Sequence, residues 1–467
     1  MAADRAFLSR REERGLKWVS VALISLVAFE TLAVATAMPT VVRALDGANL
    51  YALAMGIPMA IQLVATAVAG PWSDHHSPQS CLYAGVVLFV AGLTVCTFAP
   101  SMYVFTLGRA IQGFGGGLSI VPLYALIGHH VHPKAQPSFF AAFAAAWVLP
   151  AMIGPAVAGL VVEHASWRWI FGFVPAIALL TSPILIRVVG SLPKTQPTPP
   201  SESIKRKVLL AAGAGVCVAV LQVLSGGEPG SFSPLVLTVI GGTAVLTFIF
   251  VRPLLPAGTL GARRGLASTV LLRGTANGAF VGVEVFLPLL LQVVHGWTPV
   301  AAGLVLTTGS LTWAAGSAIS SRITDPGMRG RIALFGVATQ LAGTTVTFAG
   351  VFAGVSGIVV IGGWALTGLG IGLIYPTMTV HGLAMTPVES KGKTSSSLQI
   401  ADTLGAAFCV AVAGIGYALA MPNVTASFAS VIGLMIVVLL VALPVSRRIR
   451  PLPGSAEETE LAANEAL

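Results

Sequence analysis

Long apolar segments alternate with short polar connectors along nearly the whole chain. In a window of roughly 19 residues, these segments are long enough to cross the hydrocarbon core of a bilayer as helices. Six of them precede a proline-rich, basic stretch, two follow it, and six more complete the chain. The predicted segments are 18–43, 50–72, 80–99, 102–127, 138–162, 169–188, 208–225, 234–251, 266–294, 299–321, 331–352, 355–380, 397–420 and 424–446.

The composition supports a membrane protein. Hydrophobic residues make up 55% of the chain and charged residues only 9%, whereas a soluble globular protein has about 25% charged residues. Lipid is the solvent in which helices that are apolar all round remain stable. The four cysteines lie inside apolar segments without paired or metal-like spacing, which indicates core residues rather than disulfides or ligands.

The basic residues predict the orientation in the membrane. If the amino terminus is cytoplasmic, 22 of the 26 lysines and arginines lie in the tails and the cytoplasmic connectors, which is the positive-inside distribution. Both termini are then cytoplasmic, and the net charge of +9 faces anionic lipid headgroups rather than nucleic acid. Removing the middle pair of segments preserves this orientation, so only their freedom from charge favours fourteen spans over twelve.

Two ionisable residues lie within the apolar segments of the first half. Glu30 is near the middle of the first segment, where the lack of water disfavours the charged carboxylate, so this group can bind and release a proton. Arg109 lies in the fourth segment, one turn before Gln112, and requires a carboxylate, a carbonyl or cavity water as its partner. We therefore expect Glu30 and Arg109 to act in proton coupling, with Glu30 and Gln112 also lining the substrate cavity. The alternative for each charged residue is a structural role.

A second polar set lies in the other half. At about 100° per residue, Arg273, Asn277 and Glu284 fall within roughly 40° of one another on one helix. This stripe is expected to face the bundle interior, with Asn277 and Glu284 lining the substrate path. The alternative for Arg273 is that it snorkels to the cytoplasmic edge. Asp402 lies in the first turns of the thirteenth segment, either as a coupling residue or at the watery cytoplasmic mouth.

The chain carries no nucleotide-binding glycine loop with a lysine, no zinc signature and no nucleophile elbow. His129, His130 and His132 form a small cluster, for which a solvated connector is favoured over a metal site. We therefore expect no enzymatic activity, no metal and no cofactor. Transport is expected to draw its energy from a proton gradient.

Several motifs resemble the major facilitator superfamily, in its drug:proton antiporter branch with fourteen transmembrane helices. The first helix has Glu30 where an aspartate is usual, and the connector after the second keeps only the glycine and aspartate of its pattern. The fourth helix carries an Arg-x-x-Gln-Gly motif, and the fifth carries the antiporter signature. The matching residues are Glu30, Gly70, Asp74, Arg109, Gln112, Gly113, Gly154, Pro155 and Gly159.

The resemblance implies two six-helix bundles around a central cavity with alternating access, and an additional pair of helices outside this core. The motif glycines and Pro155 would allow helices to approach closely and bend. The expected divisions are an N-terminal bundle at 1–190, a cytoplasmic linker at 191–207, two additional helices at 208–252, a C-terminal bundle at 253–446 and a cytoplasmic tail at 447–467.

The resulting prediction is a monomeric, multi-pass exporter of the inner membrane of a bacterium. It would exchange protons for amphipathic small molecules while in contact with lipids and without binding nucleic acid. Acidic groups in an apolar cavity suit a lipophilic cation. The alternatives are a dedicated exporter of one lipid or secondary metabolite, an importer, and a membrane sensor or scaffold that transports nothing.

Overall fold

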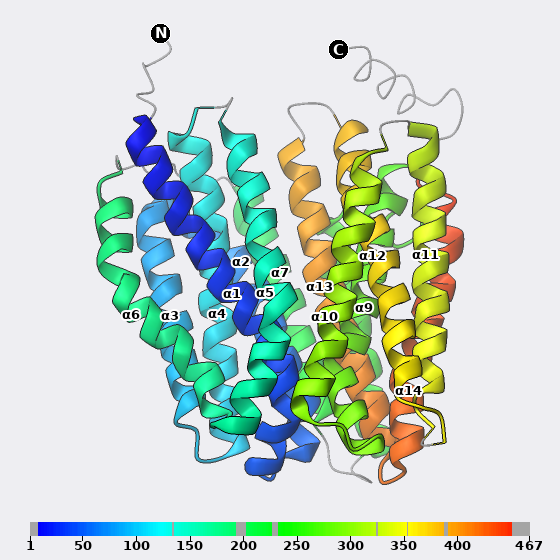
Figure 1. Cartoon of the computed structure of the whole chain (residues 1–467). Helices are drawn as coiled ribbons and strands as arrows, with labels where there is room; N and C mark the ends of the chain where they lie inside the picture. The colour runs from blue at the N-terminus through cyan, green and yellow to red at the C-terminus, as the bar shows by residue number, and fades with distance from the viewer. Residues whose placement is uncertain are drawn as a thin grey trace.

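The computed structural model is all-α over the residues that it describes, with helices running roughly parallel to one long axis (Figure 1). The description covers residues 8–132, 135–192, 202–226, 232–323, 326–352, 354–386 and 391–450.

The helices follow the predicted order of six, two and six. The first six are α1 (Arg10–Ala44), α2 (Tyr51–His75), α3 (Pro78–Thr97), α4 (Met102–His130), α5 (Gln136–His164) and α6 (Arg168–Gly190), with a short 3-10 turn at Ala48–Leu50. The middle pair is α7 (Glu202–Ser225) and α8 (Pro234–Val251). The last six are α9 (Leu266–Val294), α10 (Pro299–Ser321), α11 (Pro326–Ala349), α12 (Ile358–Ala384), α13 (Lys391–Ala420) and α14 (Val424–Ser446).

Among the residues that the structure describes, fewer helices than predicted are long and apolar enough to cross a membrane. Twelve helices meet this requirement within the described part of the chain. The other two are α5, of which only Ile153–His164 forms an uninterrupted described apolar stretch, and α10. Several hydroxyl side chains lower the hydropathy of α10, among them Thr307, Thr308 and Thr312. The prediction of fourteen spans is therefore not confirmed.

The first helix begins earlier than its apolar segment predicts. α1 starts at Arg10 rather than at 18, because Ser9 and Glu12 form a capping box at its amino end. The Ser9 backbone amide donates to Glu12 Oε2 at 2.9 Å, and the Glu12 amide donates back to Ser9 Oγ at 3.4 Å. A hydropathy window detects only the apolar segment of such a helix and not the polar turns that precede it.

The two sets of six helices form two side-by-side units, and the described chain begins with α1 and ends after α14 at the same end of the molecule (Figure 1). Within the first unit α4 packs against α2 and α3, and α1 packs against α5 and α6. Within the second, α9 packs against α12, α13 and α14, and α12 packs against α10 and α11. Between the units, α5 packs against α10 and α2 against α13.

The middle pair of helices is arranged asymmetrically. α8 packs mainly on α7 and is largely uncovered, as expected for a helix outside the core. α7 instead packs against both α2 and α13, so it contacts both units. Its fully buried Gln222 donates from Nε2 to the Ala407 carbonyl at 2.8 Å, and the same side chain fills the space beside Gly56.

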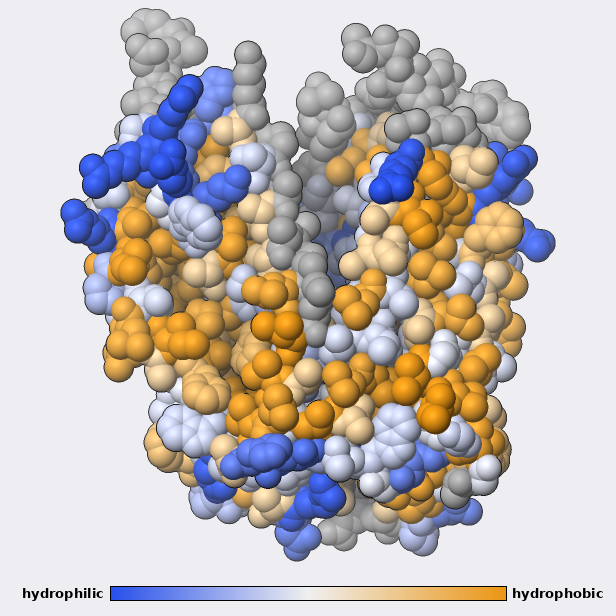
Figure 2. All heavy atoms as spheres, viewed as in Figure 1, coloured by the Kyte–Doolittle hydropathy of each residue, from blue (hydrophilic) through white to orange (hydrophobic). Residues whose placement is uncertain are grey.

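The surface has the distribution of a bilayer-spanning protein. On the face shown in Figure 2, hydrophobic side chains form a band across the middle of the molecule, and hydrophilic side chains gather toward its two ends. Large hydrophobic side chains are exposed on these helices, among them Leu179 and Leu180 of α6 and Val437 of α14. Figure 2 also shows the surface hollowed between the two units at the end that carries the termini.

Candidate functional site

A buried polar cluster joins α1 to α4 in the first unit. Glu30 forms an ion pair with Arg109, and Gln112 Nε2 donates to Glu30 Oε2 at 2.7 Å. Arg109 also donates to Gln112 Oε1 and, from Nε, to the Ala54 carbonyl at 3.4 Å. All three residues are at most 5% exposed. The structure thus brings Glu30, Arg109 and Gln112 together, and of the partners considered for Arg109 it shows a carboxylate and a carbonyl. Their roles in proton coupling and in the substrate cavity stay predictions.

Close helix packing holds this cluster in place. A Cβ atom at Gly113 would lie 2.3 Å from the Pro58 carbonyl oxygen, so only glycine allows α4 to approach α2 at this level. This approach brings Arg109 within reach of the Ala54 carbonyl on α2. A buried ion pair is stable only when further hydrogen bonds satisfy its remaining groups. The α2 carbonyl and Gln112 supply those bonds.

A second buried cluster lies in the other unit, between α9, α12 and α13. Arg273 of α9 donates to Asp402 Oδ2 of α13 from Nη2 at 2.6 Å and from Nε at 2.8 Å. Tyr375 of α12 donates to the same oxygen at 2.8 Å, and its ring lies 4.0 Å from the guanidinium carbon of Arg273. Asn277 Nδ2 donates to the Asp402 carbonyl at 3.3 Å. Four side chains on three helices thus form one network.

This network corrects two of the alternatives considered for the second half. Arg273 does not snorkel to the edge, because its side chain is buried and paired. Asp402 does not lie at a watery mouth, since it is 3% exposed. Its Oδ1 atom is buried without a hydrogen-bond partner among the described residues, while Oδ2 accepts three bonds.

Glu284 has a different environment from the other two intramembrane acids. It lies on the same face of α9 as Asn277 and is partly exposed. Within the described part of the chain it has no hydrogen-bond or ion-pair partner. The predicted polar stripe on α9 is therefore present, but only its first two members belong to the ion-paired network.

Contacts between the two units gather at the end opposite the termini. The exposed Glu163 near the end of α5 accepts a hydrogen bond from the Val300 backbone amide of α10 at 2.9 Å. Arg43 donates to Gln292 Oε1 at 2.9 Å, linking α1 to α9. A Cβ atom at Gly159 would lie 2.5 Å from Val300 Cα. The two units are therefore closed together at this end and separated at the other.

The remaining motif residues differ in how closely they are packed. Pro155 packs at the α5–α10 contact, where a Cβ atom at Gly303 would lie 2.4 Å from its carbonyl oxygen. A Cβ atom at Gly154 would make only an ordinary contact, 3.6 Å from Phe29, and at Gly70 it would meet nothing within 4 Å. The Asp74 side chain lies outside the described part of the structure, so its predicted role stays a prediction.

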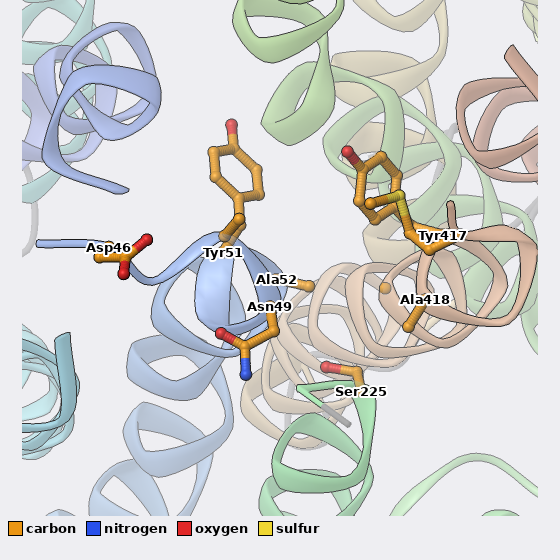
Figure 3. Close-up of a pocket in the computed structure, with 10 residues that line it drawn as sticks. Asp46, Asn49, Tyr51, Ala52, Ser225, Tyr417 and Ala418 are labelled. Atoms are coloured by element: carbon orange, nitrogen blue, oxygen red, sulfur yellow. The ribbon is translucent and has the colours of Figure 1, made fainter. Parts of the chain in front are cut away.

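A cavity of about 320 Å³ lies at the closed end, between α2, α7 and α13 (Figure 3). Asp46 and Asn49 line it from the α1–α2 connection, Ser225 from the end of α7, and Tyr417 from α13. The Tyr51 hydroxyl at its edge donates to the Val285 carbonyl, which adds a further link between the units. No group of three histidine, cysteine or acidic side chains is placed to hold a metal ion among the described residues.

Sequence reasoning missed the aromatic members of the site. Tyr375 lies 27 positions before Asp402, and no sequence signal connects the two. The same holds for Trp313, whose ring contacts Phe280 at 5.0 Å and Tyr375 at 5.6 Å between centroids. Glu163 was foreseeable only as a residue just beyond the apolar segment 138–162. Its partner on α10 depends on the tertiary arrangement.

Comparison with known proteins agrees with this arrangement. The family model for the Major Facilitator Superfamily matches residues 20–408 and 285–466. A probable multidrug-efflux transporter of Mycobacterium tuberculosis is 25% identical over 407 residues, covering 81% of this chain and 82% of that protein. Multidrug transporter protein MdtP of Bacillus subtilis is 23% identical over 396 residues, covering 82% of this chain and 71% of that protein.

Solved structures share the fold. The crystal structure of the peptide transporter POT in complex with sulfate aligns with a TM-score of 0.65 and 17% identity. The alignment covers 93% of this chain and 95% of that one. At this level of identity the likeness establishes the arrangement of helices and nothing about the substrate.

Proposed function

The chain belongs to the Major Facilitator Superfamily and is a transporter rather than an enzyme, and we propose that it exports amphipathic small molecules in exchange for protons. The observation that carries this proposal is the buried Glu30–Arg109–Gln112 cluster. The names of the two bacterial multidrug relatives support the substrate class. Because these relatives are only distantly similar to this chain, the individual substrate has to be identified by experiment.

Glu30 is proposed as the proton carrier. Its carboxylate is buried between α1 and α4, where a charge persists only while it is paired. Protonation would remove the charge that Arg109 pairs with and free its guanidinium to bond elsewhere. This change in pairing couples proton binding to the relative position of two helices. Asp402 and Arg273 are the second candidate pair for the same role.

The proposed orientation places the termini, and the hollow between the units, in the cytoplasm. In that orientation the structure is open to the cytoplasm and closed outside, as required for loading an exported molecule. We also propose that α5 and α10 cross the membrane, which would give fourteen spans. With 29 and 23 residues they are as long as the other spans. A monomer in a bacterial inner membrane remains our expectation.

The energetics allow export against a gradient. One charge crossing a potential of 100 mV supplies about 2.3 kcal/mol. At about 1.4 kcal/mol per tenfold change, one proton per neutral substrate could hold a gradient of roughly fifty-fold.

The test is transport in liposomes. Full-length protein is reconstituted, a pH gradient is imposed, and uptake of ethidium is followed for wild type, Glu30→Gln and the control Glu12→Gln, which changes an exposed acid at the start of α1. We expect gradient-driven uptake by wild type and the control, and its loss in Glu30→Gln. Undiminished uptake by Glu30→Gln would transfer the coupling role to Asp402. A folded wild type without uptake would favour a dedicated exporter of one lipid or metabolite.

A further inference from the structure

Exposed arginines gather at the end of the second unit that carries the carboxyl terminus. They come from the connector between α8 and α9 and from the segment after α14, and we call them the arginine cluster: Arg252, Arg263, Arg264, Arg447 and Arg448. None of them forms an ion pair within the described part of the chain. From residue 232 onward, the described acidic residues are Glu284 and Asp402, which lie inside α9 and α13. This surface is therefore positively charged without an internal counter-charge.

Backbone contacts bring the two segments of the cluster together. The Gly265 amide donates to the Arg448 carbonyl at 2.9 Å, and Arg448 Nη1 donates to the Ala262 carbonyl at 3.5 Å. The connector is itself compact, since Gly258 has a φ angle of 84° and its carbonyl accepts from the Arg263 amide at 3.1 Å. The Arg448 guanidinium therefore lies beside the connector that carries the other charges.

This concentration of charge favours one kind of ligand. Like charges gathered on one surface repel each other, and a bound anion removes that cost. The guanidinium group stays charged at any physiological pH and offers parallel N–H donors that match the oxygens of a phosphate. The arginine cluster is thus suited to a partner that carries phosphate.

An apolar strip leads from the cluster along α8. At about 100° per residue, Gly242, Val245, Ile249 and Arg252 fall within about 80° of one another. Val245 and Ile249 are 59% and 57% exposed, and a Cβ atom at Gly242 would meet nothing within 4 Å. α8 is also the least covered of the candidate spans, with 17% of its apolar window buried. Arg252 therefore stands where an uncovered apolar face ends and the basic surface begins.

From this juxtaposition we propose that the surface binds an anionic phospholipid, with its phosphate in the arginine cluster and its acyl chains along the strip on α8. A soluble acidic partner would use the charges and leave the strip uncovered, so the strip favours a lipid. Bound lipid would offset the repulsion between the arginines and stabilise the contact between the start of α9 and the end of α14. The proposal goes beyond the export function and does not depend on which molecule is exported.

Lipid binding to the purified full-length protein in detergent tests this site. The probes are dioleoyl phosphatidylglycerol, which is anionic, and dioleoyl phosphatidylcholine, which has the same chains and no net charge. Native mass spectrometry gives the apparent Kd of the first bound lipid. We expect wild type to bind phosphatidylglycerol at least tenfold more tightly than phosphatidylcholine. Arg263→Gln combined with Arg264→Gln should weaken phosphatidylglycerol binding at least fivefold and leave phosphatidylcholine binding within twofold.

A matched control removes the same charge elsewhere. Arg11→Gln combined with Arg14→Gln takes two exposed arginines from α1, at the same end of the first unit, and should change the phosphatidylglycerol affinity less than twofold. Arg252→Gln is a second variant of the site, at the end of the apolar strip, and should weaken binding at least threefold. If the paired cluster variant does not unfold cooperatively, the single variant decides the test.

Three results would overturn the proposal. Equal affinities of wild type for the two lipids would show that the headgroup charge is not recognised. Equal losses in the cluster and control pairs would mean that net charge alone attracts the lipid. Displacement of the bound lipid by soluble glycerol 3-phosphate at the same concentration would identify a site for a free phosphate ester. None of these measurements involves transport, so their outcome is independent of the proton-coupled export proposed above.

Discussion

The Glu163 carboxylate of α5 accepts a hydrogen bond from the Val300 backbone amide in the first turn of α10, at 2.9 Å. This amide is one of the donors that a helix leaves unpaired at its amino end, where the helix dipole also favours a negative charge. Thr298 caps the same turn by accepting from the Ala301 amide. The contact joins the two units at their closed end, so we interpret it as a latch.

Neutralising this latch should loosen the closed end. We expect Glu163→Gln to shift the population toward the conformation that is open at the end opposite the termini, because the amide side chain loses the charge that the helix end favours. Distances between spin labels on the ends of α5 and α10 measure the shift. Glu12→Gln is the matched control, since Glu12 bonds only within its own capping box. An unaltered distance distribution in Glu163→Gln would show that the contact is incidental.

The same latch should respond to pH. The backbone hydrogen bond from Val300, followed by that from the Thr298 side chain, lowers the pKa of Glu163 below its ordinary value. The contact is therefore complete above the ordinary glutamate pKa and is lost as pH falls through the lowered one. His164 is the charged neighbour that acts in the same direction. In the spin-label experiment, acidification below about pH 4 should open wild type and leave Glu163→Gln unchanged.

The glycines of the antiporter signature should differ in their tolerance of a methyl group. At Gly159 a Cβ atom would lie 2.5 Å from backbone of α10, which cannot yield locally. At Gly154 it would make an ordinary contact with Phe29 at 3.6 Å. We expect Gly159→Ala to reduce transport at least tenfold by holding α5 and α10 apart, and Gly154→Ala to have little effect. Equal activities of the two variants in liposomes would contradict this reading of the interface.

Much of this fold could be predicted from the sequence, because a bilayer imposes length and polarity on each helix. The helix order follows from the apolar segments, and the common end of α1 and α14 from the distribution of the basic residues. The cost of burying charge singled out Glu30 and Arg109, but a carboxylate was only one of the partners considered for Arg109. The angular spacing on α9 also placed Arg273 and Asn277 on one face. The number of spans is not confirmed, since twelve helices qualify among the described residues and α5 and α10 are not among them.

The partners across helices could not be predicted, because periodicity fixes the direction of a side chain only within its own helix. Arg273 and Asp402 are 129 positions apart, and which face of α13 meets α9 is a property of the packing. The same limit applies to Gln222, whose position between α2 and α13 is visible only in three dimensions.

The packing of α7 between α2 and α13 predicts that two substitutions compensate for each other. A Cβ atom at Gly56 would lie 2.1 Å from the amide carbon of Gln222, so Gly56→Ala should displace this side chain from the Ala407 carbonyl. We expect a loss of about 1–3 kcal/mol in stability, as for an unsatisfied buried amide. Adding Gln222→Ala should remove the clash, so the double variant unfolds like Gln222→Ala alone. Gly70→Ala, whose Cβ atom meets open space, is the control for the substitution itself.

The Arg273–Asp402 pair allows its structural and functional roles to be separated. Asp402→Leu leaves a buried guanidinium without its carboxylate, which should cost about 3–5 kcal/mol in unfolding free energy. Arg273→Met combined with Asp402→Leu replaces both charges with apolar groups and should recover most of that loss. Tyr375→Phe removes one of the three bonds to Oδ2 and should cost about 1 kcal/mol.

These stabilities are measured by denaturation of the full-length protein in detergent, and transport is then measured on the variants that remain folded. Undiminished stability in Asp402→Leu would mean that the pair is not formed in the native protein. If the double variant is stable and still takes up ethidium when the pH gradient is imposed, the pair has a structural role and Glu30 alone carries the proton. If the double variant is stable but inactive, the second cluster takes part in coupling, because the loss of transport cannot then be attributed to unfolding.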